Sequence, residues 1–266
     1  MKYLYLTLSS IIIAYLVLLI FIYFYQRNLL YHPSENNYQN DKILFSYEET
    51  FINVDDEIKL KSWIIKKDVK NFKTLVFFHG NAGDLSNRIH KLNELDKLNI
   101  NILLTSWRGF SGNKGSPTEK NLYADGEAVI KWLNDQGVNN SNIILYGESL
   151  GTGVALEIGK KNIFNSIILE SPFTSIENSA KIFYPYLPVR ILLKDRFDNI
   201  SKIQNIKVPI LIMHGEKDDI VPFSMGKELY EKANNPKFSH FTSNDDHMME
   251  FNDQMISKIR EFILKY

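Results

Sequence analysis

The stretch GESLG, residues 147–151, decides the fold of this chain. An apolar run typical of a buried β-strand, 142–146, comes directly before it, and a run compatible with a helix begins at Thr152. A serine between two glycines at a strand-to-helix turn is the pattern that lifts a nucleophilic hydroxyl clear of a sheet. The glycines remove side chains that would clash in so tight a turn. Because these five letters also fit an ordinary surface turn, the rest of the chain has to decide between the two interpretations.

The composition narrows the class of protein. A chain of 266 residues is long enough for one large α/β domain or two small ones. Lys+Arg and Asp+Glu both number 31, so no charge imbalance points to a nucleic-acid partner. The absence of cysteine excludes disulfides, thiolate metal sites and cysteine nucleophiles. No histidine and carboxylate cluster has the spacing of metal ligands, so we expect no metal and no organic cofactor, and we interpret His79 and His214 as structural loop residues.

The N-terminal segment predicts a membrane anchor. Residues 3–25 contain no charged side chain and, as a helix rising about 1.5 Å per residue, would span the roughly 30 Å hydrocarbon layer of a bilayer. A cleaved signal peptide is the alternative, but its apolar core would be shorter, and the small-x-small cleavage site that should follow is missing from 26–31. We therefore expect a single-pass membrane protein whose partner is the lipid bilayer. Because Lys2 and Arg27 flank the helix almost equally, the side of the membrane on which the rest of the chain lies is left open.

After a polar juxtamembrane connector, 26–42, strand-like and helix-like runs alternate to the end of the chain. We expect strands at 49–54, 57–66, 74–78, 100–105, 142–146, 166–170, 208–213 and 238–242, and helices at 85–98, 119–136, from 152, 224–233 and 249–264. Such alternation predicts a mostly parallel central sheet with helices on both faces, which is an α/β fold. We assign residues 43–266 to this one domain.

The segment 171–207 interrupts the alternation. It carries Phe173, Phe183, Tyr184 and Tyr186 and then a run of charged residues. It is either a helical connector with a solvated charged face or a small cap whose aromatic side chains line an acyl pocket, and the sequence leaves both interpretations open.

A serine nucleophile needs a base and an acid that orients the base. In chains with a serine at this kind of turn, the acid follows the serine in the sequence, and the histidine follows the acid. The loop expected to hold the acid offers Asp218 at its crest and Asp219, which is better placed to cap the next turn, so we choose Asp218. After this loop come His240, inside a predicted strand, and His247, in the loop beyond. We choose His247 as the base of Ser149.

The developing oxyanion needs two backbone N–H donors. Leu150, directly after the serine, provides one. The second is expected from the loop 79–83, where small neighbours let the amide of Asn81 approach a substrate. An ordinary glycine-rich turn is the alternative, and the position of the loop after the strand 74–78 favours the donor.

Several segments together resemble the α/β-hydrolase superfamily, and within it the membrane-anchored serine hydrolases of the abhydrolase-domain type, which include depalmitoylases. The matching segments are FFHGNAG (77–83), SWRGFSGNKGSPTEKNLYADGEA (106–128), YGESLGTG (146–153), ESPFTSI (170–176), LPVRILLKDRFDNI (187–200) and HGEKDDIVP (214–222). By position, the resemblance implies Ser149 as nucleophile, Asp218 as acid and His247 as base. Relatives often have glycine before this histidine, whereas here Asp245 and Asp246 precede it. We expect these carboxylates to raise the basicity of the imidazole or to compete for its orientation.

The sequence thus predicts a membrane-anchored serine hydrolase that cleaves carboxylic ester or thioester bonds through an acyl-Ser149 intermediate. An anchored site favours small-molecule or acylated, lipid-like substrates. A serine peptidase of the same fold and a non-catalytic membrane-bound interaction protein are the alternatives, because a fold does not fix the chemistry. The oligomeric state is left open.

Overall fold

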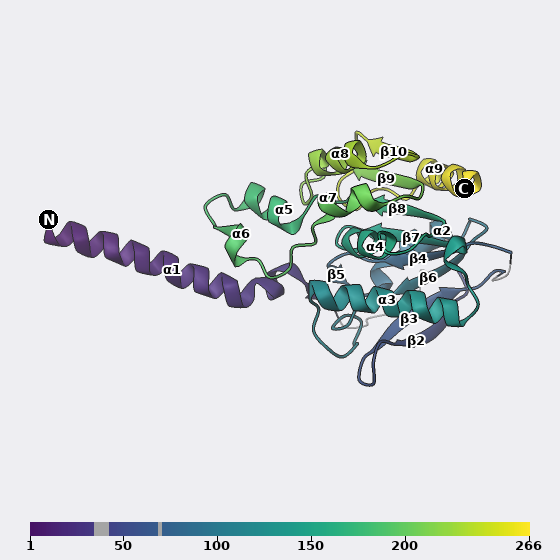
Figure 1. Ribbon diagram of the computed structural model, residues 1–266, viewed down its shortest axis with the longest axis horizontal. Helices are drawn as coiled ribbons and strands as arrows, with labels where there is room; N and C mark the ends of the chain where they lie inside the picture. The colour runs from purple at the N-terminus through teal and green to yellow at the C-terminus, as the bar shows by residue number, and fades with distance from the viewer. Residues whose placement is uncertain (35–42, 69–70) are drawn as a thin grey trace.

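A long N-terminal helix and an α/β domain make up the part of the chain that the computed structural model describes, residues 1–34, 43–68 and 71–266. The helix α1, Lys2–Leu30, extends away from the domain (Figure 1) and is long and apolar enough to cross a membrane. It continues to Leu30, into the segment predicted as a connector, while 35–42 lie outside the described residues. The reason is that Gln26 and Arg27, which look like connector residues in the sequence, make hydrogen bonds to the domain.

The main sheet has eight strands within the described residues, in the order β10-β9-β8-β7-β4-β6-β3-β2. Neighbouring strands are parallel from β10 to β6, and β3 and β2 continue the sheet in antiparallel fashion. The strands are β2 Glu48–Asn53, β3 Lys59–Ile65, β4 Thr74–Phe78, β6 Asn101–Thr105, β7 Ile143–Glu148, β8 Ser166–Glu170, β9 Ile210–Gly215 and β10 Lys237–Thr242. A second small sheet pairs β1, His32–Pro33, with β5, Ala82–Gly83.

Helices cover both faces of the sheet (Figure 1), which confirms the predicted α/β class. The helices are α2 Ile89–Leu95, α3 Glu119–Asp135, α4 Gly151–Gly159, α5 Ile176–Phe183, α6 Val189–Leu192, α7 Asn199–Lys202, α8 Phe223–Lys232 and α9 Asp253–Lys265, with 3-10 turns η2 Leu85–Arg88, η3 Asn140–Asn142 and η4 Ile203–Asn205. Apolar residues of α3, α4 and α8 pack on one face, and those of α2 and α9 pack on the other. Strand β4 shows why its sequence is apolar throughout: Val76 belongs to the first core and Phe77 to the second.

Side-chain caps explain two differences from the expected helix limits. The helix predicted from 249 begins at Asp253, because the side chain of Asn252 accepts a hydrogen bond from the amide of Met255. The helix predicted at 85–98 opens as a 3-10 turn capped by Asp84.

The topology gathers the predicted site residues at one edge of the sheet. Because β4, β7, β9 and β10 run parallel, the loops that follow their C-terminal ends lie along the same edge. Asn81, Ser149, Asp218 and His247 all lie in these loops. The predicted segment 171–207 contains α5, α6 and α7 and lies over this edge, beside the C-terminal half of α1 (Figure 1).

Candidate active site

Ser149 occupies the turn between β7 and α4 in a left-handed backbone conformation, with a φ of 48°. Such a conformation costs free energy for a residue with a side chain and is maintained only where the surroundings require it. The flanking glycines meet that requirement. A Cβ atom at Gly147 would lie 2.6 Å from the Cα of Thr152, and one at Gly151 would lie 1.9 Å from the carbonyl oxygen of Phe78. The two glycines of the motif therefore allow the close backbone contacts that hold Ser149 in place.

The structure brings Ser149, His247 and Asp218 into one hydrogen-bonded row. His247 Nε2 lies 3.0 Å from Ser149 Oγ, and His247 Nδ1 lies 2.7 Å from Asp218 Oδ2. The ring therefore stands between hydroxyl and carboxylate with one nitrogen toward each, as a base oriented by an acid requires. The two alternatives from the sequence lie outside this row: Asp219 is exposed, and His240 lies in β10.

Asp218 is held in its ionised form. Burial alone would raise the pKa of this carboxyl, but hydrogen bonds from His214 and His247 outweigh it and lower the pKa. His214 Nε2 lies 3.1 Å from Asp218 Oδ2, and the amide of Val221 donates to Asp218 Oδ1 at 2.7 Å. Sequence reasoning gave His214 only a structural role, and the structure places it directly on the predicted acid. Its place near the end of β9, four residues before Asp218, is the signal that could have suggested this contact.

His79, which directly follows β4, is unsuited to act as a base. His79 is fully buried, and burial, with a smaller effect from the charge of Arg88, lowers its pKa to about 3. Its Nδ1 lies 2.8 Å from the carbonyl oxygen of Gly80. A neutral His79 therefore supports the shape of the loop 79–83 rather than exchanging protons at neutral pH.

The predicted oxyanion donors border the same cavity as the serine. Asn81, Ser149 and Leu150 line the same cavity, and within the described part of the chain neither the Asn81 nor the Leu150 amide donates a hydrogen bond to the protein. The end of α1 fixes the position of Asn81. The side-chain amide of Asn81 donates to the carbonyl of Leu30 at 2.7 Å, and its carbonyl accepts from the amide of His32 at 2.8 Å.

The cavity beside Ser149 has a volume of about 270 Å³ and an uncharged lining. Its wall is built from the end of α1, the segment 171–207 and the loop after β9: Leu29, Leu30, Phe173, Ile176, Ser179, Ala180, Phe183, Tyr184, Ile220 and Val221, besides the site residues. Among the aromatic residues named from the sequence, Phe173, Phe183 and Tyr184 contribute to this wall, while Tyr186 is 64% exposed. The segment 171–207 therefore has the position of a cap, and we call it the cap below.

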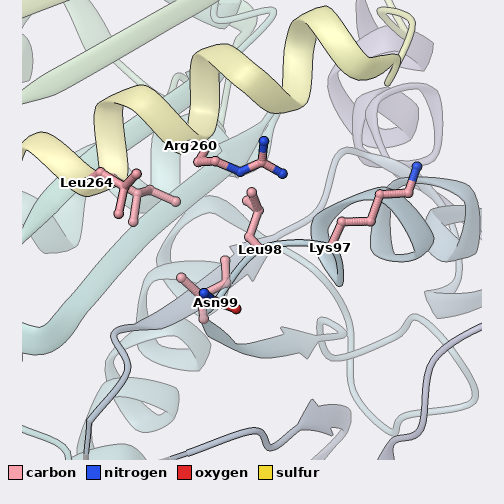
Figure 2. Close-up of a pocket in the computed structure, with 7 residues that line it drawn as sticks. Lys97, Leu98, Asn99, Arg260 and Leu264 are labelled. Carbon is pink, nitrogen blue, oxygen red and sulfur yellow. The ribbon is translucent and has the colours of Figure 1, made fainter.

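Another hollow, of about 100 Å³, lies between α9 and residues 97–100 (Figure 2). Residues 97–100 precede β6, so this hollow is at the N-terminal edge of the parallel strands, opposite Ser149. Lys97 and Arg260 contribute to its lining. It contains none of the predicted site residues.

A buried ionic network lies directly behind the serine, and sequence reasoning missed it. Glu148 Oε1 lies 2.5 Å from Arg88 Nη2, and Glu148 Oε2 lies 2.9 Å from Lys91 Nζ, which also contacts Glu170 Oε1 at 2.5 Å. Burial opposes ionisation of Glu148, yet the charges of Arg88 and Lys91 bring its pKa well below the usual value. Glu148 Oε1 also accepts a hydrogen bond of 3.2 Å from the amide of Gly80, which connects the network to the predicted oxyanion loop.

The sequence did contain a signal for this network. The buried strands β7 and β8 both end in glutamate, and the register places Glu148 beside Glu170. Two neighbouring carboxylates that are removed from water require cationic partners. The helix α2 provides one of them, Lys91, which is completely buried.

The two extra carboxylates before His247 face other groups. Asp245 Oδ2 accepts a hydrogen bond from the Thr242 hydroxyl at 2.7 Å, and Asp246 Oδ1 accepts one from the amide of Met248 at 2.9 Å. His247 Nδ1 is occupied by Asp218. The expected competition for the ring is therefore absent from these contacts. Across 1–34, 43–68 and 71–266, no group of three or more histidine and carboxylate side chains is placed to hold a metal ion.

Comparison with known proteins identifies the family. A model of the prolyl oligopeptidase family matches residues 112–266, which is more than half of the chain. The chain belongs to this family, within the α/β-hydrolase superfamily. An uncharacterized protein of Mycobacterium tuberculosis, Rv2307c, is 34% identical over 222 residues, covering 82% of this chain and 79% of that protein. Human alpha/beta hydrolase domain-containing protein 17B is 34% identical over 193 residues, covering 71% of this chain and 66% of that protein.

Solved structures agree on the fold of this α/β hydrolase. The Pyrococcus furiosus esterase Pf2001 superposes with a TM-score of 0.70 at 22% identity, covering 89% of this chain and 98% of that one. Est1E from Butyrivibrio proteoclasticus, solved with ferulic acid, gives a TM-score of 0.68 at 19% identity, covering 81% and 98%. The resemblance and the hydrolase fold predicted from the sequence are thereby confirmed.

Proposed function

We propose that this α/β hydrolase is a membrane-anchored serine esterase or thioesterase that acts through an acyl-Ser149 intermediate. The observation that carries the proposal is the row from Ser149 Oγ through His247 to Asp218, with separations of 3.0 Å and 2.7 Å. Among the described residues it combines a nucleophile, a base and an acid in the order that the fold uses.

The reaction follows from the positions of these atoms. His247 Nε2 takes the hydroxyl proton as Ser149 Oγ forms a bond to the substrate carbonyl carbon. The amides of Leu150 and Asn81 hold the oxyanion, and ionised Asp218 stabilises the imidazolium. The intermediate then expels an alkoxide or thiolate, which receives the proton from His247. Water, deprotonated by His247, then attacks the acyl-Ser149 carbonyl. The carboxylic acid product leaves as His247 returns the proton to Ser149 Oγ.

The cavity favours an apolar acyl group. Its lining carries no charged side chain, and leucine, isoleucine and phenylalanine form most of its wall. Burying an apolar chain there gains about 25 cal/mol per Å² of surface removed from water. A substrate with a charged group in this cavity would lack a partner for that charge.

Contacts between α1 and the domain favour a retained anchor over a cleaved leader. Arg27 Nε lies 2.9 Å from Asp195 Oδ2, and Gln26 is buried. The backbone carbonyl of Leu30 fixes Asn81. Removal of α1 would leave these partners without their contacts and open the wall of the cavity, so the helix is an integral part of the proposed enzyme.

Replacement of the nucleophile tests the proposal. We expect the full chain, in detergent or lipid nanodiscs, to react with a fluorophosphonate probe and to hydrolyse short p-nitrophenyl esters. Ser149→Ala should abolish the labelling and lower ester hydrolysis at least about a thousandfold. Unchanged hydrolysis by Ser149→Ala would refute the mechanism, and a folded wild type that neither reacts nor hydrolyses would favour a non-catalytic interaction protein. Because the family is named for an oligopeptidase, peptide amides are tested in parallel. A preference for peptide amides over esters would show that the enzyme is a peptidase.

A further inference from the structure

The cap leaves a group of large apolar and aromatic side chains exposed. Figure 1 shows α5 and α6 beside the C-terminal half of α1, projecting from the sheet on the same side as this helix. The exposed large apolar and aromatic residues of this part of the cap, which we call the cap tip, are Ile182, Phe183, Tyr184, Tyr186 and Ile191. Exposed apolar residues that gather in one place mark an interaction surface.

Hydrogen bonds fix the cap tip at a definite level along α1. The hydroxyl of Tyr15 donates to the carbonyl of Tyr186 at 2.7 Å. Further along the helix, Gln26 donates to the carbonyl of Leu192 at 2.9 Å and accepts from the amide of Lys194 at 2.8 Å. At about 1.5 Å per residue, these contacts extend along roughly 16 Å of the helix axis.

This level lies inside the hydrocarbon layer if α1 is the anchor, and the inference rests on that part of the proposed function. About 20 helical residues cross the layer, and they have to lie within the uncharged stretch 3–25. Whichever 20 residues of this stretch cross the layer, the last of them on the domain side lies between Ile22 and Tyr25. Tyr15 then lies about 10 to 15 Å below the surface of the layer, for a helix near the membrane normal. The carbonyl of Tyr186 accepts from the Tyr15 hydroxyl, so it lies no farther from this level than the length of a tyrosine side chain and one hydrogen bond, and therefore still below the surface of the layer.

We propose that the cap tip inserts into the bilayer leaflet beside α1, and that its partner is the acyl-chain region of that leaflet. The bond from Tyr15 provides the Tyr186 carbonyl with the partner that a backbone group needs in lipid. Lys194 lies nearer the domain, with its Nζ 4.1 Å from the centre of the Tyr23 ring, at the level where cations and aromatic rings meet the headgroups. Arg190, beside the exposed Ile191, has a side chain long enough to reach the headgroups.

The insertion connects the bilayer with the catalytic cavity. Phe183 and Tyr184 belong to the cap tip and also line the cavity that contains Ser149. Leu29 and Leu30, from the end of α1, line the same cavity. An acyl chain can therefore pass from the leaflet to the site along apolar side chains without crossing water, which commits the substrate to a membrane-embedded acyl chain.

A depth measurement tests the insertion in the full chain. Because the protein has no cysteine, single variants can carry an environment-sensitive nitrobenzoxadiazole label in nanodiscs of phosphatidylcholine and phosphatidylglycerol. Ile191→Cys reports on the cap tip. Ile163→Cys is the matched control, since Ile163 and Ile191 are 75% and 82% exposed and Ile163 precedes β8, at the opposite edge of the sheet. Ile12→Cys reports on α1.

We expect labels at Ile12 and Ile191 to shift to the blue and to be quenched by nitroxide lipids, while the label at Ile163 is quenched by aqueous iodide. If Ile191 behaves like Ile163 while Ile12 reports lipid, the insertion is refuted and the anchor stands. If Ile12 reports water, the anchor is wrong, and the depth argument fails with it whatever Ile191 reports.

An activity comparison provides the second readout. Neither Ile191 nor Ile163 lines the cavity. We expect Ile191→Asp to lower hydrolysis of a long-chain ester presented in nanodiscs about fivefold, because a carboxylate at the edge of the hydrocarbon layer weakens insertion of the apolar cap tip. It should leave a short soluble ester unaffected, and Ile163→Asp should affect neither substrate. Equal effects of the two variants, or an equal loss on both substrates, would contradict a membrane role of the cap tip.

Discussion

Two buried carboxylates lie near Ser149 in different surroundings. Asp218 belongs to a loop at the edge of the sheet, where its Oδ2 contacts His247 Nδ1, and the same loop contributes Ile220 and Val221 to the cavity beside Ser149. Glu148, directly before the serine, is enclosed by Arg88 and Lys91. Both carboxyls have a lowered pKa although burial opposes it. Burial and a shifted pKa therefore do not distinguish the carboxylate that we propose to be catalytic from a structural one. The partners do: Asp218 contacts an imidazole that also faces Ser149, whereas Glu148 contacts an arginine and a lysine.

The largest expected effect is on the catalytic side of this comparison. Asp218→Asn should lower kcat/KM for a short p-nitrophenyl ester about 10³- to 10⁴-fold, because a neutral amide neither holds the proton on His247 Nδ1 nor stabilises the imidazolium. The thermal unfolding temperature should fall, because the lowered pKa of Asp218 means that its charge stabilises the folded state, but the loop should keep its shape, since the asparagine oxygen can still accept from the amides of Ile220 and Val221. A loss of less than tenfold would remove Asp218 from the mechanism.

In the buried network around Glu148, Lys91→Met should lower the free energy of unfolding. It leaves Glu148 and Glu170 close together in a fully buried site, and breaking such a pair costs about 3–5 kcal/mol. We expect a clear fall in the denaturation midpoint in detergent. Lys97→Met is the control, because Lys97 pairs with Glu94 at the surface and its loss should cost less than about 1 kcal/mol. Equal midpoints for the two variants would show that the network contributes no stability.

The two glutamates of the network should differ in the sign of their pH dependence. The pKa of Glu148 is lowered, so its ionised form stabilises the fold above the ordinary value of 4.5 and this contribution is lost as the pH falls. Burial raises the pKa of Glu170, so the stability from its neutral form is present below 4.5 and is lost as the pH rises. The cost of Glu148→Gln should grow from about pH 3 to about pH 5 and then level off, whereas Glu170→Gln should become relatively more favourable from about pH 5 to about pH 8. Thermal unfolding across these ranges measures both slopes, and slopes of the same sign would contradict the assignment.

The contrast also shows what the sequence could and could not predict. The strands 74–78 and 166–170 follow directly from their apolar runs, because a parallel strand covered on both faces has no polar side to interrupt the pattern. Placing Ser149, Asp218 and His247 at one edge needs only that the preceding strands run parallel, which the alternation predicts. The partners of Glu148 depend on the register between β7 and β8 and on how α2 packs on the sheet. Neither can be inferred from the residues around the GESLG motif.

The end of α1 was unpredictable for the same physical reason. Gln26 and Arg27 look like solvated connector residues, and their partners, Leu192, Lys194 and Asp195, are remote in the chain. The aromatic residues of the cap were a related difficulty. Phe183 faces the cavity and Tyr186 faces outward, a distinction set by the docking of the cap on α1 rather than by composition.

The smallest expected effect belongs to Asp246, a carboxylate adjacent to His247 in sequence but turned away from its ring. Asp246 is exposed, and its Oδ1 accepts from the amide of Met248 at 2.9 Å, a bond that an asparagine oxygen can also make. An exposed charge acts on the ring through water, where its effect is weak and screened by salt. Asp246→Asn should therefore change kcat/KM for a short ester by less than about twofold at neutral pH. Because Asp218→Asn is the same chemical change, the ratio of the two losses measures what direct contact with Nδ1 contributes. A large loss for Asp246→Asn, reversed at high salt, would show that the charge of Asp246 acts on the imidazole at a distance.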